Sequence, residues 1–169
     1  MPADPSSAKG RRGERRTAAA NFVWLKNEAG RAGVPQRRSF ERWVDAALAG
    51  RRRQAEVNVL IVNEDAGRGF NRHYRGKDYA TNVLSFPYEP LPQERSRLLG
   101  DLVICSPVVQ REAAEQGKAL NDHYAHLTVH GVLHLLGYDH ETEDEAEIME
   151  GIERRVLAAL GIADPYVKA

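Results

Sequence analysis

The chain of 169 residues lacks several features that would assign it to a class at once. It has one cysteine, Cys105, so no disulfide can form within the chain, and we expect a small buried hydrophobe there. It has no run of about eighteen apolar residues, which excludes a membrane-spanning helix. The arginines near the N-terminus are not followed by an apolar segment, so we expect no secretory signal. These absences predict a cytoplasmic location.

The chain also has no net charge, because 24 Lys and Arg residues balance 24 Asp and Glu residues. The two signs are nevertheless separated along the chain. Residues 1–55 carry 13 basic and 5 acidic side chains, whereas residues 56–169 carry 11 and 19. Nucleic acids respond to local patches of charge, so the neutral total does not exclude a nucleic-acid-binding role. Each basic cluster taken alone is more typical of a solvated helix face or loop than of a nucleic-acid contact.

Residues 1–17 hold Pro, Ser, Gly and Arg without apolar periodicity, which predicts a disordered basic extension. This extension could add non-specific affinity for RNA, or be a solvated tail or a wrongly assigned start, and the sequence does not separate these. We expect residues 18–169 to form a single domain with one core, as their length allows.

Apolar periodicity predicts an α+β fold, with a small mixed four-stranded sheet packed against about five helices. Ser39 and Ser106 are the expected N-caps of two helices, and Thr142 with Glu145 predicts a capping box for the last one. Residues 88–97 have no pattern and predict a mobile loop. The expected strands are 21–25, 57–62, 82–86 and 102–105. Of the expected helices, one begins after Ser39, a short one runs toward Tyr74, and the other three cover 107–116, 121–137 and 142–160.

Three histidines carry the strongest signal, in the segment His-Gly-Val-Leu-His-Leu-Leu-Gly-Tyr-Asp-His over residues 130–140. His130 and His134 are four residues apart and therefore share one helix face. Gly137 favours the end of that helix, after which the chain can return and bring His140 to the same point. Three neutral imidazoles with one open position are typical of a catalytic zinc site. Imidazole also suits iron and other divalent metals.

His126 precedes His130 by four residues and also shares this helix face. One ion cannot reach both His126 and His134, which would lie about 12 Å apart along the axis. A set of His126, His130 and a distant third ligand would leave Gly137 and His140 unexplained. We therefore interpret His126 as a packed residue beside the metal site.

The same histidine spacing occurs in metzincin peptidases, where a glutamate after the first histidine is the general base. Here that position is Gly131, which has no side chain to accept a proton. The pattern therefore still predicts a metal site, but the residue that would act as general base in peptide hydrolysis is absent.

The residues 130–140 resemble the signature H-G-x-L-H-L-x-G-Y-D-H of the YbeY family of bacterial endoribonucleases at every fixed position. Residues 71–78, 81–87 and 99–104 also resemble blocks of that family, and the likeness extends from about residue 19 to the end. The resemblance implies a zinc-dependent endoribonuclease that cuts single-stranded RNA in ribosomal RNA maturation and ribosome quality control. Its implied partners are ribosomal RNA and the small ribosomal subunit.

The resemblance also implies that His130, His134 and His140 bind one zinc ion and that Arg75 is required for activity. A planar guanidinium matches two phosphate oxygens at once, which suits Arg75 to a phosphodiester. Lys77 is a weaker candidate for contact with the RNA backbone. Asp139 either orients a ligand histidine through its second ring nitrogen or caps a helix.

The nucleophile stays open, because no general base is visible in the sequence. Either zinc-bound hydroxide attacks the phosphate, or the ribose 2′-OH attacks with zinc as Lewis acid. Two other functions also stay open. One is a zinc peptidase, which Gly131 opposes, and the other is a non-catalytic ribosome-associated assembly factor in which zinc is structural.

Overall fold

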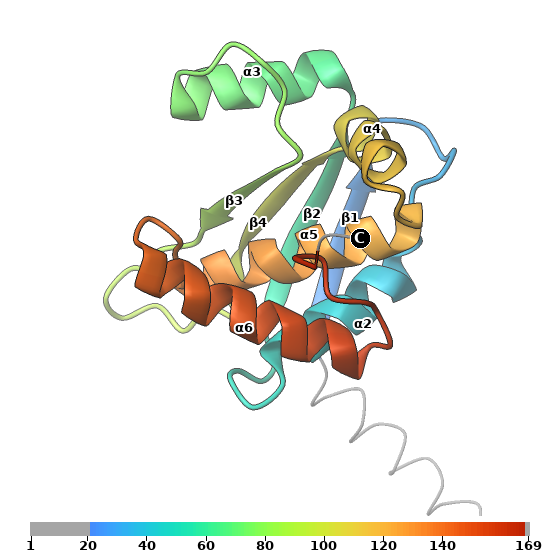
Figure 1. Ribbon diagram of the computed structural model, residues 1–169. Helices are drawn as coiled ribbons and strands as arrows, with labels where there is room; N and C mark the ends of the chain where they lie inside the picture. The colour runs from blue at the N-terminus through green and yellow to red at the C-terminus, as the bar shows by residue number, and fades with distance from the viewer. Residues whose placement is uncertain (1–20, 168–169) are drawn as a thin grey trace, which may run out of the picture.

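The computed structural model describes residues 21–167, so the predicted extension over residues 1–17 lies outside the described part (Figure 1). The described strands form one four-stranded sheet in the order β1-β2-β4-β3. Three strands run parallel and the edge strand β3 is antiparallel to β4, which confirms the predicted mixed sheet. The strands are β1 (Phe22–Asn27), β2 (Glu56–Val62), β3 (Val83–Pro87) and β4 (Leu98–Cys105).

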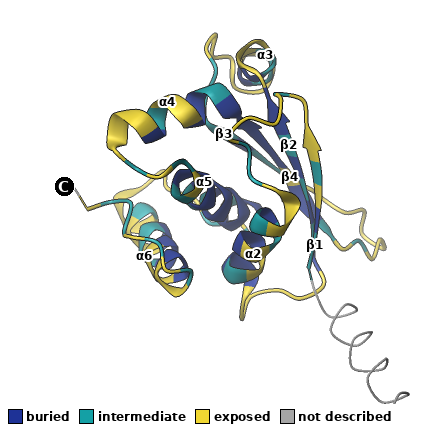
Figure 2. Ribbon diagram, turned by 90° about the vertical axis from the view of Figure 1, so that its right-hand side faces the viewer, coloured by how far each residue is buried: buried dark blue, intermediate teal, exposed yellow. Residues whose placement is uncertain are grey.

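Five helices accompany the sheet within residues 21–167, as the periodicity predicts. The central helix α5 packs against β3 and β4 on one side and against α6 on the other, with α2 beside it. Figure 2 shows these layers, with the sheet at one side, α5 and α2 next to it, and α6 outermost. None of the described helices is long and apolar enough to cross a membrane. The helices are α2 (Arg37–Leu48), α3 (Glu64–Arg75), α4 (Ser106–Gln116), α5 (Leu120–Leu135) and α6 (Glu143–Ala159).

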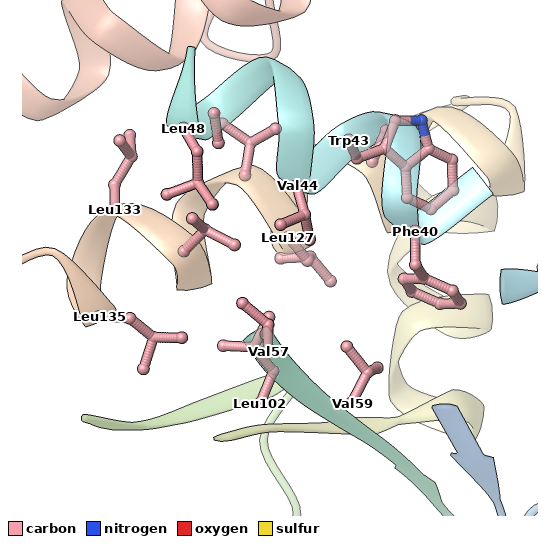
Figure 3. Packing of buried hydrophobic residues seen from close by; sticks show 14 of the residues in the cluster. Phe40, Trp43, Val44, Leu48, Val57, Val59, Leu102, Leu127, Leu133 and Leu135 are labelled. Carbon is pink, nitrogen blue, oxygen red and sulfur yellow. The ribbon is translucent and has the colours of Figure 1, made fainter. Parts of the chain in front are cut away.

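The main core lies between the sheet and the helices α2 and α5 (Figure 3). Alternate residues of the central strands, such as Val57, Val59 and Leu102, face this core because side chains alternate across a strand. They meet the apolar stripe of α2, which contains the fully buried Phe40 and Trp43. The core thus fixes the position of α5, the helix that carries the first two histidines of the predicted metal site.

Several predicted boundaries were wrong. Ser39 does not cap α2, because its backbone N–H already donates to the Gln36 carbonyl and the helix begins at Arg37. Ser106 is the first residue of α4 rather than its cap. The strand β4 begins four residues earlier than predicted, at Leu98. Its first residues pair with β2 on one side and with the end of β3 on the other. The Thr142 cap is confirmed, since its hydroxyl accepts the Glu145 N–H at 3.1 Å.

Candidate functional site

A cleft of about 580 Å³ lies beside the C-terminal end of α5. Its walls come from three parts of the chain: Arg75 at the end of α3, residues of β3 with those just before it, and α5 with the turn that follows. The first two parts are close in the sequence, but the cleft residues of α5 and its turn lie more than forty residues later, and the fold described above brings them together. Both metal-site and phosphate-site candidates line this one cleft.

The three predicted ligands meet in the cleft. His130 and His134 come from α5 and His140 from the turn after it, and one ring nitrogen of each lies within 4.8 Å of the others. The Nε2 atoms of His130 and His134 are 3.2 Å apart. The structure therefore confirms that the spacing brings these three imidazoles to one point.

The turn that returns His140 to the site depends on Gly137. This glycine has φ of +101°, a left-handed conformation that a side chain would strain. The Gly137 N–H donates to the His134 carbonyl at 3.0 Å, and the Tyr138 N–H donates to the Leu133 carbonyl at 3.0 Å. This pair of bonds is a Schellman motif, which satisfies the last carbonyls of α5 and reverses the chain.

The three histidines fit a divalent metal ion. Tetrahedral zinc, with bonds of about 2.0–2.1 Å, separates its ligand nitrogens by about 3.4 Å. The 3.2 Å between His130 and His134 is close to this value, and the other two separations are at most 4.8 Å. Burial lowers the pKa of His134, and the neighbouring His130 and His140 lower it further. The neutral imidazole that results is the form that binds a metal. His140 is exposed, so one side of the group is open to a substrate.

Sequence reasoning missed Glu153 of α6, which is fully buried next to the histidines. Its Oε1 accepts a hydrogen bond from Nδ1 of His130, and its Oε2 bonds the Tyr166 hydroxyl and, at 3.3 Å, Nε2 of His126. Burial alone would raise the pKa of Glu153, but the hydrogen bonds from His126 and His130 outweigh it and lower the pKa to about 2. A visible signal was the position of Glu153 within the apolar stripe of α6, beside Ile152.

His126 lies outside the group of three, as predicted. Its ring centroid is 6.3 Å from that of His130, and its Nε2 is engaged with Glu153 and the Tyr166 hydroxyl. The Asp139 carboxylate accepts the His140 backbone N–H at 2.8 Å and makes no hydrogen bond to a ligand ring among the described residues. This bond lies in the turn between α5 and α6, whose caps are Leu136 and Thr142, so it is not the helix capping expected for Asp139. The carboxylate beside the His130 ring is that of Glu153.

Gly131 has a packing role that the sequence did not reveal. A Cβ at this position would lie 2.7 Å from Leu102 Cδ2 and 3.3 Å from the Ser85 hydroxyl oxygen. Leu102 is fully buried in the core, so it has little freedom to move. The absence of a side chain at position 131 therefore lets α5 approach the sheet, in addition to removing the glutamate of the peptidase pattern.

Gly131→Ala should lower the free energy of unfolding by about 1–3 kcal/mol, because the added methyl group overpacks the contact with Leu102. Gly151→Ala in α6 is the matched control, since a Cβ there has nothing within 4 Å. The control should raise the free energy of unfolding by about 0.5–1 kcal/mol, as alanine favours a helix interior. Urea denaturation measures both changes, and stabilisation of equal size in the two variants would contradict the packing role.

Arg75 is the last residue of α3 and lines the cleft that contains the histidines. Among the described residues it has no ion-pair partner, whereas Arg68 and Arg111 pair with Asp78 and Glu64 at 2.8 Å. Its guanidinium is therefore free to meet an anion. Lys77, two residues further on, is exposed and is not among the residues that line the cleft.

Comparison with known proteins agrees with this geometry. The family model described as Endoribonuclease YbeY matches residues 25–161. The chain belongs to the YbeY family. A YbeY relative from Stenotrophomonas maltophilia (strain R551-3) is 66% identical over 140 residues, covering 80% of this chain and 87% of the relative. Another, from Xanthomonas axonopodis pv. citri (strain 306), is 64% identical over 141 residues with the same coverage of 80% and 87%.

The fold of the YbeY family also has a solved counterpart. A solution structure from Thermotoga maritima covers 87% of this chain and 99% of its own, with a TM-score of 0.53 and 24% identity. This likeness concerns the fold alone. It supports the arrangement of sheet and helices that forms the cleft.

Proposed function

We propose that this chain is a zinc-dependent endoribonuclease that cuts single-stranded RNA. The observation that carries this proposal is the convergence of three imidazoles in one cleft. Arg75, which has no ion-pair partner within residues 21–167, lines the same cleft. The relatives named above carry the name Endoribonuclease YbeY, which supports the same activity here. On this proposal His130, His134 and His140 hold the zinc ion, and Arg75 is the catalytic residue of the chain itself.

Arg75 contributes positive charge where a phosphodiester develops negative charge during cleavage. Its guanidinium can donate two parallel hydrogen bonds to two non-bridging oxygens and so stabilise the transition state. When bound, zinc would supply a Lewis acid and a lower pKa for water. Lys77 would contact the RNA backbone beyond the cleft.

The physiological substrate on this proposal is ribosomal RNA in the bacterial cytoplasm, with the small ribosomal subunit as partner. The family membership supports this assignment. The exposed His140 makes the group of three histidines accessible from solvent, as an RNA substrate requires.

Two alternatives are less well supported. A peptidase would need a general base at position 131, where a side chain would clash with Leu102. A non-catalytic factor would use zinc only as a structural clip. The main core, however, contains none of the three ligand histidines, so the fold has an apolar interior that does not depend on the metal.

One set of assays on the full chain separates these functions. Zinc content is measured together with cleavage of a single-stranded RNA and of casein, before and after chelation. The proposal expects RNA cleavage alone, lost on chelation while the helical circular dichroism persists. Casein cleavage would support the peptidase, and unfolding on chelation without any RNA cleavage would support the structural clip.

We further propose that residues 18–169 form the catalytic domain and that the basic stretch 1–17 adds RNA affinity. Deleting residues 1–17 should leave zinc content and fold unchanged but weaken RNA binding and make its salt dependence shallower. Each lost phosphate contact should reduce the slope of log K against log salt by about 0.7 for single strands. Filter binding at several salt concentrations measures this slope, and an unchanged slope would show that the stretch makes no contact with RNA.

A further inference from the structure

The buried carboxylate of Glu153 lies between α5 and α6, and the proposed function does not yet explain it. We propose that Glu153 is a positioning residue of the metal site, which fixes the tautomer and ring orientation of His130 and is itself held by Tyr166 and His126. This inference rests on the proposed metal site and adds to it a carboxylate, a fourth histidine and a tyrosine beyond the last helix.

The geometry at His130 sets its tautomer. An ionised carboxylate can only accept hydrogen bonds, so the contact between Glu153 Oε1 and His130 Nδ1 requires the ring proton on Nδ1. The other ring nitrogen, Nε2, then carries a lone pair, and it lies 3.2 Å from Nε2 of His134 inside the group of three. Hydrogen bonding of this kind orients a metal-binding histidine and increases the basicity of its free nitrogen.

The second oxygen of Glu153 is fixed independently of His130. The Tyr166 hydroxyl donates to Oε2, and Nε2 of His126 lies 3.3 Å from the same oxygen. Nδ1 of His126 is buried without a hydrogen-bond partner in the described structure, which agrees with a neutral ring that carries its proton on Nε2. Both carboxylate oxygens of Glu153 are hydrogen-bonded, so rotation of the side chain would break these hydrogen bonds. Because the residue is fully buried, water could not replace them, and the rotation would be costly.

Tyr166 is held in turn by Arg154 of α6 and by Asp164, which follows this helix. Its backbone N–H donates to Asp164 Oδ1 at 2.8 Å, and Arg154 bonds the other oxygen of Asp164 at 3.1 Å. The Arg154 guanidinium also lies 5.3 Å from the centre of the Tyr166 ring. The chain after α6 therefore turns back toward α5, as Figure 1 shows in red, and contributes to the site.

The test is zinc affinity, measured on the full chain by competition with a chromogenic chelator. Glu153→Gln removes the charge but preserves the shape, and should weaken zinc binding about 10- to 100-fold. Tyr166→Phe leaves Glu153 in place but removes one donor, and should weaken binding in the same direction by less. Glu147→Gln is the matched control, since Glu147 is an exposed residue of the same helix and should bind zinc like the wild type.

A second measurement does not depend on metal or on activity. Long-range ¹H–¹⁵N correlation of ¹⁵N-labelled histidine reports the tautomer of each ring in the metal-free protein. The wild type should show His130 with its proton on Nδ1, and Glu153→Gln should shift the ring toward a mixture of tautomers. This measurement on the wild type decides the matter even if Glu153→Gln fails to fold.

The outcomes separate the two proposals. Wild type and Glu153→Gln binding zinc equally tightly, or a His130 proton on Nε2 in the metal-free wild type, would overturn the positioning role alone. A wild-type protein that binds no zinc would overturn the metal site on which the proposed function depends.

Discussion

His134→Ala should lower the zinc content of the purified protein from about one ion per chain to near zero and remove RNA cleavage. His134 has one of three ring nitrogens that lie within 4.8 Å of one another and that we propose as the zinc ligands, and two imidazoles alone hold zinc weakly. Lewis-acid stabilisation by a metal is worth several kcal/mol, so we expect the rate to fall at least about 1,000-fold. Elemental analysis and an RNA cleavage assay measure the two effects.

His126→Ala tests separately whether His126 is itself a ligand. His126 belongs to the same helix and contacts Glu153, but its ring lies outside the ligand group. The variant should therefore retain its zinc when the metal is in excess. Conversely, His140→Ala should behave like His134→Ala, and full zinc occupancy in the His140→Ala protein would disprove the assignment of His140 as a ligand.

Arg75→Ala should keep its zinc and its fold yet lose about 100- to 1,000-fold in RNA cleavage, the usual cost of one lost donor to a developing oxyanion. The side chain lines the cleft and has no ion-pair partner among the described residues, so its removal leaves the remaining structure intact. Arg75→Lys should recover only part of the rate, because an ammonium group lacks the two parallel donors of a guanidinium.

Arg72→Ala is the matched control for Arg75→Ala. Arg72 lies one turn earlier in α3, is exposed and does not line the cleft. Removing it changes the net charge by the same amount, so a general effect of charge on RNA binding would appear in both variants. Cleavage by Arg75→Ala at the wild-type rate would show that another group meets the phosphate.

The parts of the site that could be predicted from the sequence are those set by local geometry. The spacing of His130, His134 and Gly137 determines a helix face and a helix end, and both occur as expected. The start of β4 was missed because its first residues, Leu98 to Gly100, follow a loop without pattern and are strand only through pairing with β2 and β3.

Glu153 could not be assigned from the sequence for a different reason. It contacts His126 and His130 from 27 and 23 residues away, and only the packing of α6 on α5 creates that contact. Its place in the apolar stripe of α6 could mark it as buried, but it does not identify the histidines that it contacts. Gly131 is similar, since its spacing indicates a missing base but only the sheet beneath α5 explains why the position must be small.

The closeness of the three histidines along the chain has a thermodynamic consequence. They fall within eleven residues, so bringing them together costs the unfolded chain little loop entropy, and the unfolded state retains part of the affinity for the metal. Zinc should then raise the free energy of unfolding by less than the value calculated from its dissociation constant for the native state alone. The reason is that only the difference between binding to the native and to the unfolded state contributes. Denaturation curves with and without zinc measure that difference. Folding adds the groups that no short peptide can supply, the Glu153 carboxylate behind His130 and the Arg75 guanidinium at the cleft. On the proposed function, these two groups would distinguish the catalytic site from a metal-binding stretch of chain.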